Sequence, residues 1–181
     1  MPDEPVSASV AALQSGDPAE LTRFYREHAA DVLRWVLRLG GPHVLAQDVA
    51  QDVFATALRR LPSFRGEASE RTFLFAITRN VVRNARRRAA FRRFVGLDGV
   101  AEPASGEPGV DEALERSQTR RAVQTALSSL KEAWRTAIVL VDFDGLTAGE
   151  ASALLGVPEG TVHSRLHHGR KALAAALARA G

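Results

Sequence analysis

The sequence contains no cysteine among its 181 residues. This absence excludes a disulfide framework, a thiol nucleophile and any zinc or iron–sulfur site with cysteine ligands. No apolar run approaches the roughly 18 residues that a membrane-spanning helix needs, and the acidic N-terminus lacks the basic and apolar segments of a signal peptide. We therefore expect a cytoplasmic protein that does not insert into membranes.

The residue patterns of an enzyme are also missing. An active site needs convergent acids or a nucleophile beside a base, whereas the acidic residues are scattered over predicted helix faces or lie in one linker-like segment. The three histidines His163, His167 and His168 share one predicted helix, but their spacing makes a poor metal site. The sequence therefore predicts no catalytic residue, no metal and no cofactor.

Positive charge is concentrated in two stretches that flank an acidic one. Residues 59–93 hold eleven arginines against Glu67 and Glu70, which gives +9, and residues 161–181 carry four basic residues and no acid. Between them, residues 94–116 hold six acids and one arginine, which gives −5. Two basic stretches favour two contacts with a polyanion, although two solvated helix faces would give the same counts.

Apolar residues recur at helical spacing in three segments of the N-terminal half. The first sixteen residues are expected to be a frayed tail, and Asp17 is the expected N-cap of a helix with Pro18 at its first position. Gly40 ends this helix and Pro62 ends the second. The side chains expected to face inward are Leu21, Phe24, Tyr25, His28, Val32, Trp35, Val36 and Leu39 in the first helix, Leu45, Val49, Val53, Ala57 and Leu61 in the second, and Phe73, Leu74, Ile77, Val81 and Ala85 in the third.

The segment 96–110 is rich in glycine, proline and acidic residues and has no periodicity, so it is expected to be a flexible linker. Beyond it the sequence predicts four helices, at about 111–129, 131–143, 147–155 and 158–178. No strand pattern and no internal repeat is visible. The predicted fold is therefore all-α, with two small helical modules joined by a flexible acidic linker.

Residues 146–162 have the pattern of a helix-turn-helix motif. Thr147 is an expected N-cap with Glu150 completing a capping box, and Gly156 suits the left-handed turn that ends this short helix. The inward stripe of the second helix is formed by Val162, Leu166, Gly169 and Leu173. Such a motif is typical of proteins that place the second helix in the major groove of DNA.

The outward row of this second helix carries hydrogen-bond donors and basic groups and no carboxylate. Its members are Gly160, Ser164, His167, His168 and Lys171, with His163 nearby. Such a row suits a groove lined by phosphates and base acceptors. Arg165 lies closer to the buried edge, where it either contacts DNA or pairs with Glu150.

The N-terminal module combines two polar faces of opposite charge. The second helix has an acidic stripe with Asp48, Gln51 and Asp52, a pattern that is usually only a solvated face. The polar side of the third helix carries groups that can read bases and clamp phosphates, namely Arg79, Asn80, Arg83, Asn84, Arg86, Arg87 and Arg88. The preceding loop offers Phe64 to stack on or enclose an unpaired base. A simple helix-turn-helix regulator would need neither face.

From about Asp17 to Leu177 the chain resembles the extracytoplasmic-function (group IV) sigma factors of bacterial RNA polymerase. The motifs that carry the resemblance are Asp48–Phe54, Phe64–Gly66, Thr72–Asn80 and Gly160–Leu166. Each motif is weak alone, but their order and spacing on both sides of an acidic linker are specific. The resemblance implies a disordered tail over 1–16, a sigma-2 domain over 17–95, a linker over 96–112 and a sigma-4 domain over 113–178.

The implied function is that of a subunit that binds core RNA polymerase and directs promoter recognition, DNA melting and transcription initiation at a stress- or signal-responsive regulon. Sigma-2 would dock on the clamp helices of the largest polymerase subunit, and sigma-4 would rest on the flap of the second-largest subunit. Promoter DNA and an anti-sigma factor are the further partners that the resemblance implies. The polymerase supplies all the catalytic chemistry.

The resemblance also assigns residues to each contact. Core polymerase would be bound by Asp48, Gln51, Asp52 and Phe54. The minus-ten element would be contacted by Phe64, Arg65, Arg71, Arg79, Asn80, Arg83, Asn84 and Arg87. The minus-thirty-five element would be contacted by Thr161, His163, Ser164, Arg165, His167, His168 and Lys171.

Several positions depart from the family pattern. Phe73 stands where tryptophan is usual, and Lys131 replaces a usual proline. His163, His168 and Gly169 replace residues that are commonly lysine or arginine, arginine, and alanine. These changes weaken the basic character of the recognition helix, so the promoter sequence cannot be transferred from relatives.

A second reading is a stand-alone helix-turn-helix transcriptional regulator. It predicts tight binding to palindromic duplex DNA without polymerase. The asymmetric layout of two modules argues against it.

Overall fold

The computed structural model describes residues 8–42, 44–96 and 110–179. Over these residues every regular element is helical, which confirms the all-α prediction. The elements are α1 (Ala8–Ser15), α2 (Pro18–Gly40), α3 (Ala46–Arg60), the 3-10 turn η1 (Leu61–Ser63), α4 (Glu70–Phe94), α5 (Val110–Ser129), α6 (Glu132–Ile138), the π-helical turn η2 (Val139–Phe143), α7 (Ala148–Leu155) and α8 (Glu159–Ala178). None of these helices is long and apolar enough to cross a membrane.

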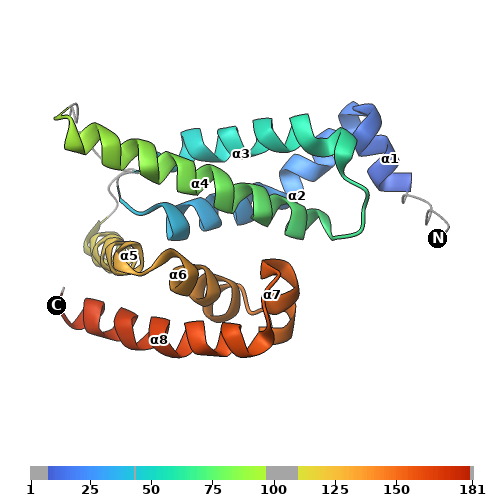
Figure 1. Ribbon diagram of the computed structural model, residues 1–181. Coiled ribbons are helices and arrows are strands. Elements are labelled where there is room, and N and C mark those ends of the chain that lie inside the picture. Colours follow the sequence, from blue (N-terminus) through green and yellow to red (C-terminus); the bar gives the residue numbers. More distant parts are fainter. Residues whose placement is uncertain (1–7, 43, 97–109, 180–181) are drawn as a thin grey trace.

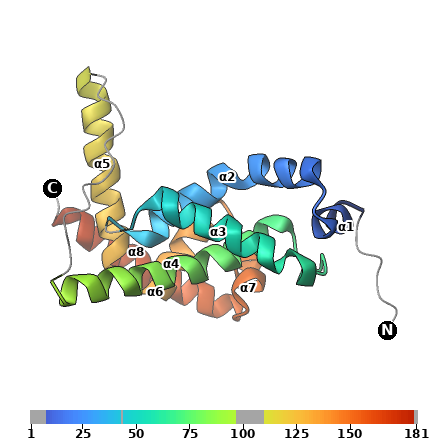
Figure 2. The same ribbon diagram turned by 90° about the horizontal axis from the view of Figure 1, so that it is seen from above.

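The helices form two layers (Figure 1). Helices α1 to α4 make up one layer, the N-terminal bundle, and α5 to α8 with η2 make up the other, the C-terminal module. The two layers pack against each other through α2, which contacts α5, α6 and η2. Seen from above, the first turns of α5 project beyond the rest of the molecule (Figure 2).

Helix α2 begins and ends where the sequence predicts. The Asp17 carboxylate accepts hydrogen bonds from the amides of Ala19 at 2.8 Å and Glu20 at 3.1 Å, and Pro18 occupies the first turn. A capping carboxylate satisfies amides that have no partner within the helix. The helix ends at Gly40.

Helices α2, α3 and α4 close the predicted core. The largest buried side chain is Trp35, whose ring meets that of Phe75 edge to face with the ring centres 5.1 Å apart. The predicted inward residues differ from the structure at Tyr25 and Leu45, which are 55% and 51% exposed. Phe75 and Val82, which the periodicity missed, are buried in α4. Because the bundle surrounds α4 on two sides, this helix buries a wider stripe than one face.

The prediction of a frayed tail over residues 1–16 is wrong for its second half. Residues 8–15 form α1, in which Val10 and Leu13 are buried. The Gln14 side-chain amide donates to the backbone carbonyl of Phe64 at 2.7 Å. Two apolar side chains were too few to give a periodic signal, and tertiary contact with η1 stabilises the helix. Residues 1–7 lie outside the described residues.

The C-terminal module departs from the prediction in its second helix. The expected continuous helix over 131–143 consists of α6 followed by η2, where the Asp144 amide donates to the carbonyl of Val139 at 3.0 Å. A π-helical turn holds one residue more than an α-helical turn. Most of the predicted linker, residues 97–109, lies outside the described residues, and α5 begins directly after it at Val110.

Glu70 organises the polar edge of the N-terminal bundle. Its carboxylate accepts hydrogen bonds from the Arg23 guanidinium at 2.8 and 3.3 Å, and its Oε2 lies 3.1 Å from Nε2 of His28. Burial raises the pKa of Glu70, but the hydrogen bonds from Arg23 and His28 outweigh it and hold the pKa below its ordinary value of 4.5. The side chain is only 18% exposed, so these bonds are protected from water.

We expect Glu70→Gln to lower the free energy of unfolding by about 1–3 kcal/mol, because charged hydrogen bonds are lost in a half-buried site. A carboxyl whose folded pKa is lowered stabilises fully above its unfolded pKa of 4.5 and loses this contribution as pH falls through the folded value. Urea unfolding at pH 7 and at acid pH measures both effects. Equal pH dependence of the variant and the wild type would contradict the assignment.

Candidate nucleic-acid interface

Three of the four predicted polymerase-binding residues share the exposed side of α3, and Phe54 lies at its edge. Asp48, Gln51 and Asp52 are exposed, and Phe54 is half-buried with its ring 4.8 Å from that of Tyr25. Tyr25 is itself 55% exposed, so an aromatic patch adjoins the acidic stripe. The sequence reading missed this patch because it placed Tyr25 in the core.

The predicted strand-binding residues share one side of α4. Arg83, Asn84 and Arg87 are exposed, and Arg79 and Asn80 are half-buried. Arg83 Nη2 donates to Oδ1 of Asn80 at 3.2 Å, which leaves the two amide protons of Asn80 free to donate to a base. The structure therefore brings together five of the six predicted residues of α4, and the sixth, Arg71, lies in its first turn.

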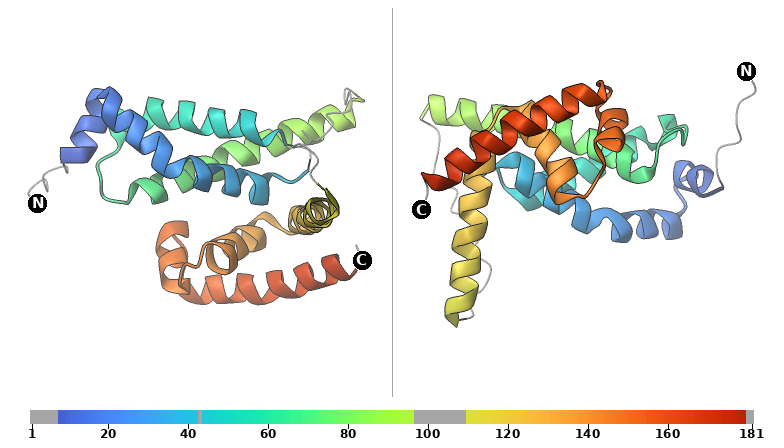
Figure 3. Two further views of the ribbon diagram at one scale, coloured as in Figure 1. Left: turned by 180° about the vertical axis from the view of Figure 1, so that it is seen from behind. Right: turned by 90° about the horizontal axis from the view of Figure 1, so that it is seen from below.

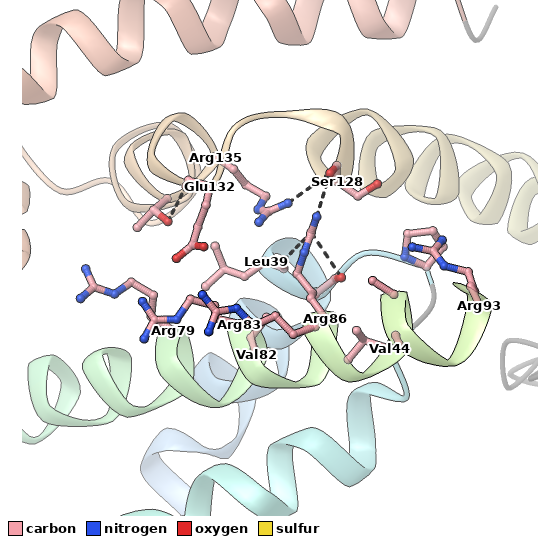
Figure 4. Close-up of a pocket in the computed structure, with 16 residues that line it drawn as sticks. Leu39, Val44, Arg79, Val82, Arg83, Arg86, Arg93, Ser128, Glu132 and Arg135 are labelled. Atoms are coloured by element: carbon pink, nitrogen blue, oxygen red, sulfur yellow. Dashed lines mark hydrogen bonds between the residues drawn. The ribbon is translucent and has the colours of Figure 1, made fainter. Parts of the chain in front are cut away.

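Arg86 lies on the same helix but has a structural role. Its guanidinium donates to the backbone carbonyls of Leu39 at 3.1 Å, Gly40 at 3.4 Å and Ser128 at 3.1 Å (Figure 4). Burial lowers the pKa of Arg86. Arg135 donates to the same Ser128 carbonyl at 3.3 Å, and burial together with the charge of Arg86 lowers its pKa to about 10. Arg86 thus links the ends of α2 and α5 and is not available to DNA in this conformation.

The basic side of α4 borders a cleft between the two layers. The cleft has a volume of about 440 Å³, and α4 contributes Arg79, Arg83 and Arg87 to its wall. Glu132 and Arg135 of α6 lie across from them (Figure 4). The C-terminal module therefore covers part of the predicted strand-binding face.

The loop before α4 differs from expectation at Phe64. This side chain is 7% exposed, and its ring lies 4.5 Å from that of Phe73, so it packs in the core and is not free to stack on a base. Arg65, the next residue, is exposed. The contact between Phe64 and Phe73 thus holds the loop against the core, and the polar residues of the loop face solvent.

Arg71, which lies in the first turn of α4, is already engaged. Its Nε donates to Asp31 Oδ2 at 2.9 Å, its Nη2 lies 3.5 Å from Asp144 Oδ2, and its guanidinium lies 5.2 Å from the ring of Trp35. Because Asp144 belongs to the C-terminal module, the side chain spans both layers. Sequence patterns gave no signal for this contact.

The helix-turn-helix motif forms as predicted by α7 and α8. The Glu150 amide donates to Oγ1 of Thr147 at 3.2 Å, and the Thr147 amide donates to the Glu150 carboxylate at 2.8 Å, which completes the capping box. Gly156 has φ 64°, the left-handed turn expected there. Gly169 sits so close to α6 that a Cβ atom would meet Cδ1 of Ile138 at 2.8 Å.

The outward row of α8 is exposed as predicted. It comprises His163, Ser164, His167, His168 and Lys171, and Thr161 at its start is half-buried. Helix α8, which carries this row, runs along the side of the C-terminal module that is farthest from the N-terminal bundle (Figure 3). The His168 ring stacks on Trp134 with the ring centres 5.7 Å apart, and His163 pairs with Glu159 at 3.5 Å.

Arg165 was expected either to contact DNA or to pair with Glu150, and the structure shows whether the pair forms. Its side chain is half-buried, while the Glu150 carboxylate accepts from the amide and hydroxyl of Thr147. Over residues 110–179, no ion pair joins Arg165 to Glu150. The pairing of Arg165 with Glu150 is therefore not formed in this structure.

One cluster has the composition of a metal site. Ligand atoms of Glu27, His28 and Glu70 lie within 4.8 Å of one another. The guanidinium of Arg23 occupies this cluster, with bonds of 2.5 Å to Glu27 and 2.8 Å to Glu70. Since Arg23 already supplies the positive charge, the cluster is explained without a metal.

Comparisons with known proteins match both layers. The model of sigma-70 region 2 matches residues 24–92, and that of sigma-70 region 4 matches residues 120–173. The chain is 34% identical over 170 residues to the ECF RNA polymerase sigma factor SigL of Mycobacterium tuberculosis, covering 92% of this chain and 93% of the relative.

Two solved structures share the fold at 24% sequence identity. One is CnrH in complex with the cytosolic domain of CnrY, with a TM-score of 0.67 and coverage of 94% of this chain and 96% of CnrH. The other is the sigma factor RpoE of Bartonella quintana in complex with the anti-sigma factor NepR, with a TM-score of 0.64 and coverage of 86% and 95%.

The two matched regions coincide with the two layers, in the order and spacing that the motifs predicted. The SigL relationship extends over nearly all of both chains. Proteins of this kind are specificity subunits and not enzymes. The chain belongs to the ECF sigma factors, which direct RNA polymerase to promoters and start transcription there.

Proposed function

We propose that the three polar faces divide the work of promoter recognition among them. The acidic stripe of α3 docks on the clamp helices of the largest polymerase subunit, through Asp48, Gln51, Asp52 and Phe54. The single observation that carries this proposal is the placement of an acidic face and a basic face on adjacent helices of one bundle. A protein that must hold both another protein and DNA needs two such surfaces.

The basic side of α4 holds the unpaired minus-ten strand. Asn80, whose amide group is oriented by Arg83, supplies hydrogen bonds to a base, and the arginines contact phosphates. Arg65 contributes from the loop before α4, and Arg71 contributes from the first turn of α4. Phe64 supports the loop from within the core and does not touch the base.

The outward row of α8 reads the minus-thirty-five element in the major groove, while the C-terminal module rests on the flap of the second-largest subunit. Ser164 and Lys171 are exposed, and His167 is exposed with its ring edge to face with that of His168, so their donors are available to DNA. Thr161, His163, Arg165 and His168 flank them. With few fixed charges, this helix binds weakly alone and depends on the polymerase to hold it in place.

An anti-sigma factor is the further partner that we propose. The fold similarity to RpoE, which is bound to the anti-sigma factor NepR, supports this assignment. The exposed aromatic and acidic surface of α2 and α3 is the surface that an inhibitor must cover to block polymerase binding. Regulation by such a partner would make the regulon respond to a signal.

Run-off transcription tests the function directly. Core polymerase with this protein should start transcription at defined sites on genomic fragments, and the start sites should share a paired minus-ten and minus-thirty-five element. The protein alone should retard duplex DNA only weakly in gel shifts. Tight binding to a palindrome without polymerase, together with no new start sites, would favour the stand-alone regulator instead.

A further inference from the structure

The cleft between the two layers is lined by more cations than the minus-ten assignment uses. Among the residues that the structure describes around it, six are arginines and one, Glu132, is an acid. The arginines are Arg79, Arg83, Arg86, Arg87 and Arg93 of α4 and Arg135 of α6. Arg79 and Arg83 rise from α4, and Glu132 reaches from α6 into the same space (Figure 4). This space and its lining residues are called the arginine cleft below.

The α6 side of the arginine cleft contains a buried cation. Arg135 is only 2% exposed, and its guanidinium points from α6 toward the space above α4 (Figure 4). Its Nη1 donates to the neutral carbonyl of Ser128 at 3.3 Å, and among the described residues its Nε has no hydrogen-bond partner. Buried charges are usually paired, and a buried donor without a partner costs free energy. The surroundings of Arg135 therefore favour an added acceptor with negative charge.

Arg86 places a second half-buried cation on the α4 side. Its guanidinium donates to three backbone carbonyls, which are neutral acceptors. Burial lowers the pKa of Arg86, Glu132 raises this pKa and Arg93 lowers it, so these charges act on one another across the cleft. An anion placed among the arginines would offset their mutual repulsion.

The dimensions of the arginine cleft suit a small ligand. Its volume of about 440 Å³ lies within the range of roughly 300–1,000 Å³ that is typical of small-molecule sites. Leu39, Val82 and Ala89 supply apolar parts of its wall. The arginines supply planar groups that bind two phosphate oxygens at once. A long DNA strand would have to pass between two packed layers, whereas a short chain of phosphates has room there.

We propose that the arginine cleft binds a small polyanion of linked phosphates, either a free oligophosphate or the phosphate chain of a nucleotide. Arg86 and Arg135 face the phosphates from the two layers, and Arg93 contacts them from the exposed end of α4. Among the described lining residues, Glu132 is the group whose charge opposes binding. Arg79, Arg83 and Arg87 are shared between this ligand and the minus-ten strand, a consequence that rests on the proposed function of α4.

Two neighbouring arginines distinguish a specific site from general attraction to a basic protein. Arg93 lines the cleft, whereas Arg92 is also exposed on α4 but does not line it. Calorimetric titration of the full-length protein with inorganic tripolyphosphate, in the absence of magnesium, should show one saturable site per chain. Arg93→Gln should raise the Kd on the order of tenfold, because a charged contact to phosphate is lost. Arg92→Gln removes the same charge and should change the Kd by less than about twofold.

Removal of the opposing carboxylate should strengthen binding. We expect Glu132→Gln to lower the Kd for tripolyphosphate by about three- to tenfold, because a like charge near the ligand is removed. Glu67→Gln is the matched control, since Glu67 is an exposed acid that does not line this cleft. A gain of affinity cannot come from unfolding, so this pair remains informative even if substitution of the buried Arg135 disrupts the fold.

Titration with GTP beside tripolyphosphate identifies the source of the phosphates. Equal affinities would assign the site to a free oligophosphate, and tighter binding of GTP that Val82→Ala weakens would assign it to a nucleotide whose base packs on the apolar wall.

Three results would overturn the proposal: no saturable binding of either probe, equal losses in Arg92→Gln and Arg93→Gln, or Arg93-dependent binding of single-stranded DNA alone. Failure of the protein to support transcription with core polymerase would instead overturn the proposed function, and the titrations would still decide whether the cleft binds phosphates.

Discussion

Reversing the charge of the α3 stripe should abolish most of the binding to core polymerase. We expect Asp48→Lys with Asp52→Lys to weaken the complex on the order of a hundredfold, since like charges brought together at an interface cost several kcal/mol and each 1.4 kcal/mol is a factor of ten. Competition for core polymerase against the labelled wild-type protein measures the affinity. Run-off transcription should fall in parallel at limiting protein.

The loss should come from the interface and not from unfolding. Asp52 pairs only with Arg88 at 3.8 Å, and both side chains are about 60% exposed, so this pair contributes little to stability. Glu67→Lys is a charge-matched control for each single reversal in the binding measurement, because Glu67 is an exposed acid in the loop before α4 and lies outside the α3 stripe. Equal losses in the control and in Asp48→Lys would point to net charge, and unchanged polymerase binding in the double reversal would remove α3 from the interface.

Reversal of two arginines on α4 should prevent productive promoter opening. Arg83→Glu with Arg87→Glu replaces two exposed cations on the proposed strand-binding side by anions. Each lost contact to a single-strand phosphate lowers the salt dependence of binding by about 0.7 in the log–log slope. We expect transcription from duplex promoters to fall on the order of a hundredfold, with polymerase binding retained.

The matched control variant makes the same change in net charge at the C-terminal end of α3. Arg59→Glu with Arg60→Glu alters two exposed arginines away from the cleft. A template already unpaired at the minus-ten element should recover part of the activity of the α4 variant, because the cost of melting has been removed. An equal defect in both pairs, or wild-type activity of the α4 pair, would argue against the assignment.

The sequence was sufficient for the helices because their signals are local. Asp17, Thr147 and Gly156 form caps and turns through neighbouring residues, and the structure confirms all three. Buried positions of α3 such as Val53 and Ala57 follow helical spacing and were found as well. Local periodicity thus predicted which side of α3, α4 and α8 faces the core.

What the sequence missed depends on contacts between distant residues. Trp35 and Asp144 are 109 residues apart, and neither stands out locally as one half of an ion-pair network. Phe64 looked exposed because it lies in a polar loop, yet Phe73 and the short helix α1 enclose it. No period or motif encodes which loop folds back onto which helix, so these contacts required the structure.

The π-helical turn η2 affects two features at once, the position of Asp144 and the direction of α7 and α8. Its extra residue sets the angle at which the chain leaves α6, and both Asp144 and the whole of α7 and α8 lie beyond it. Deleting one residue between Val139 and Phe143 would remove the extra residue of this turn and change the direction in which the chain leaves α6. The Asp144 carboxylate would leave Arg38 and Arg71, and the exposed row of α8 would point in a new direction relative to α6. The position of Asp144 and the direction of α8 therefore both depend on this one turn.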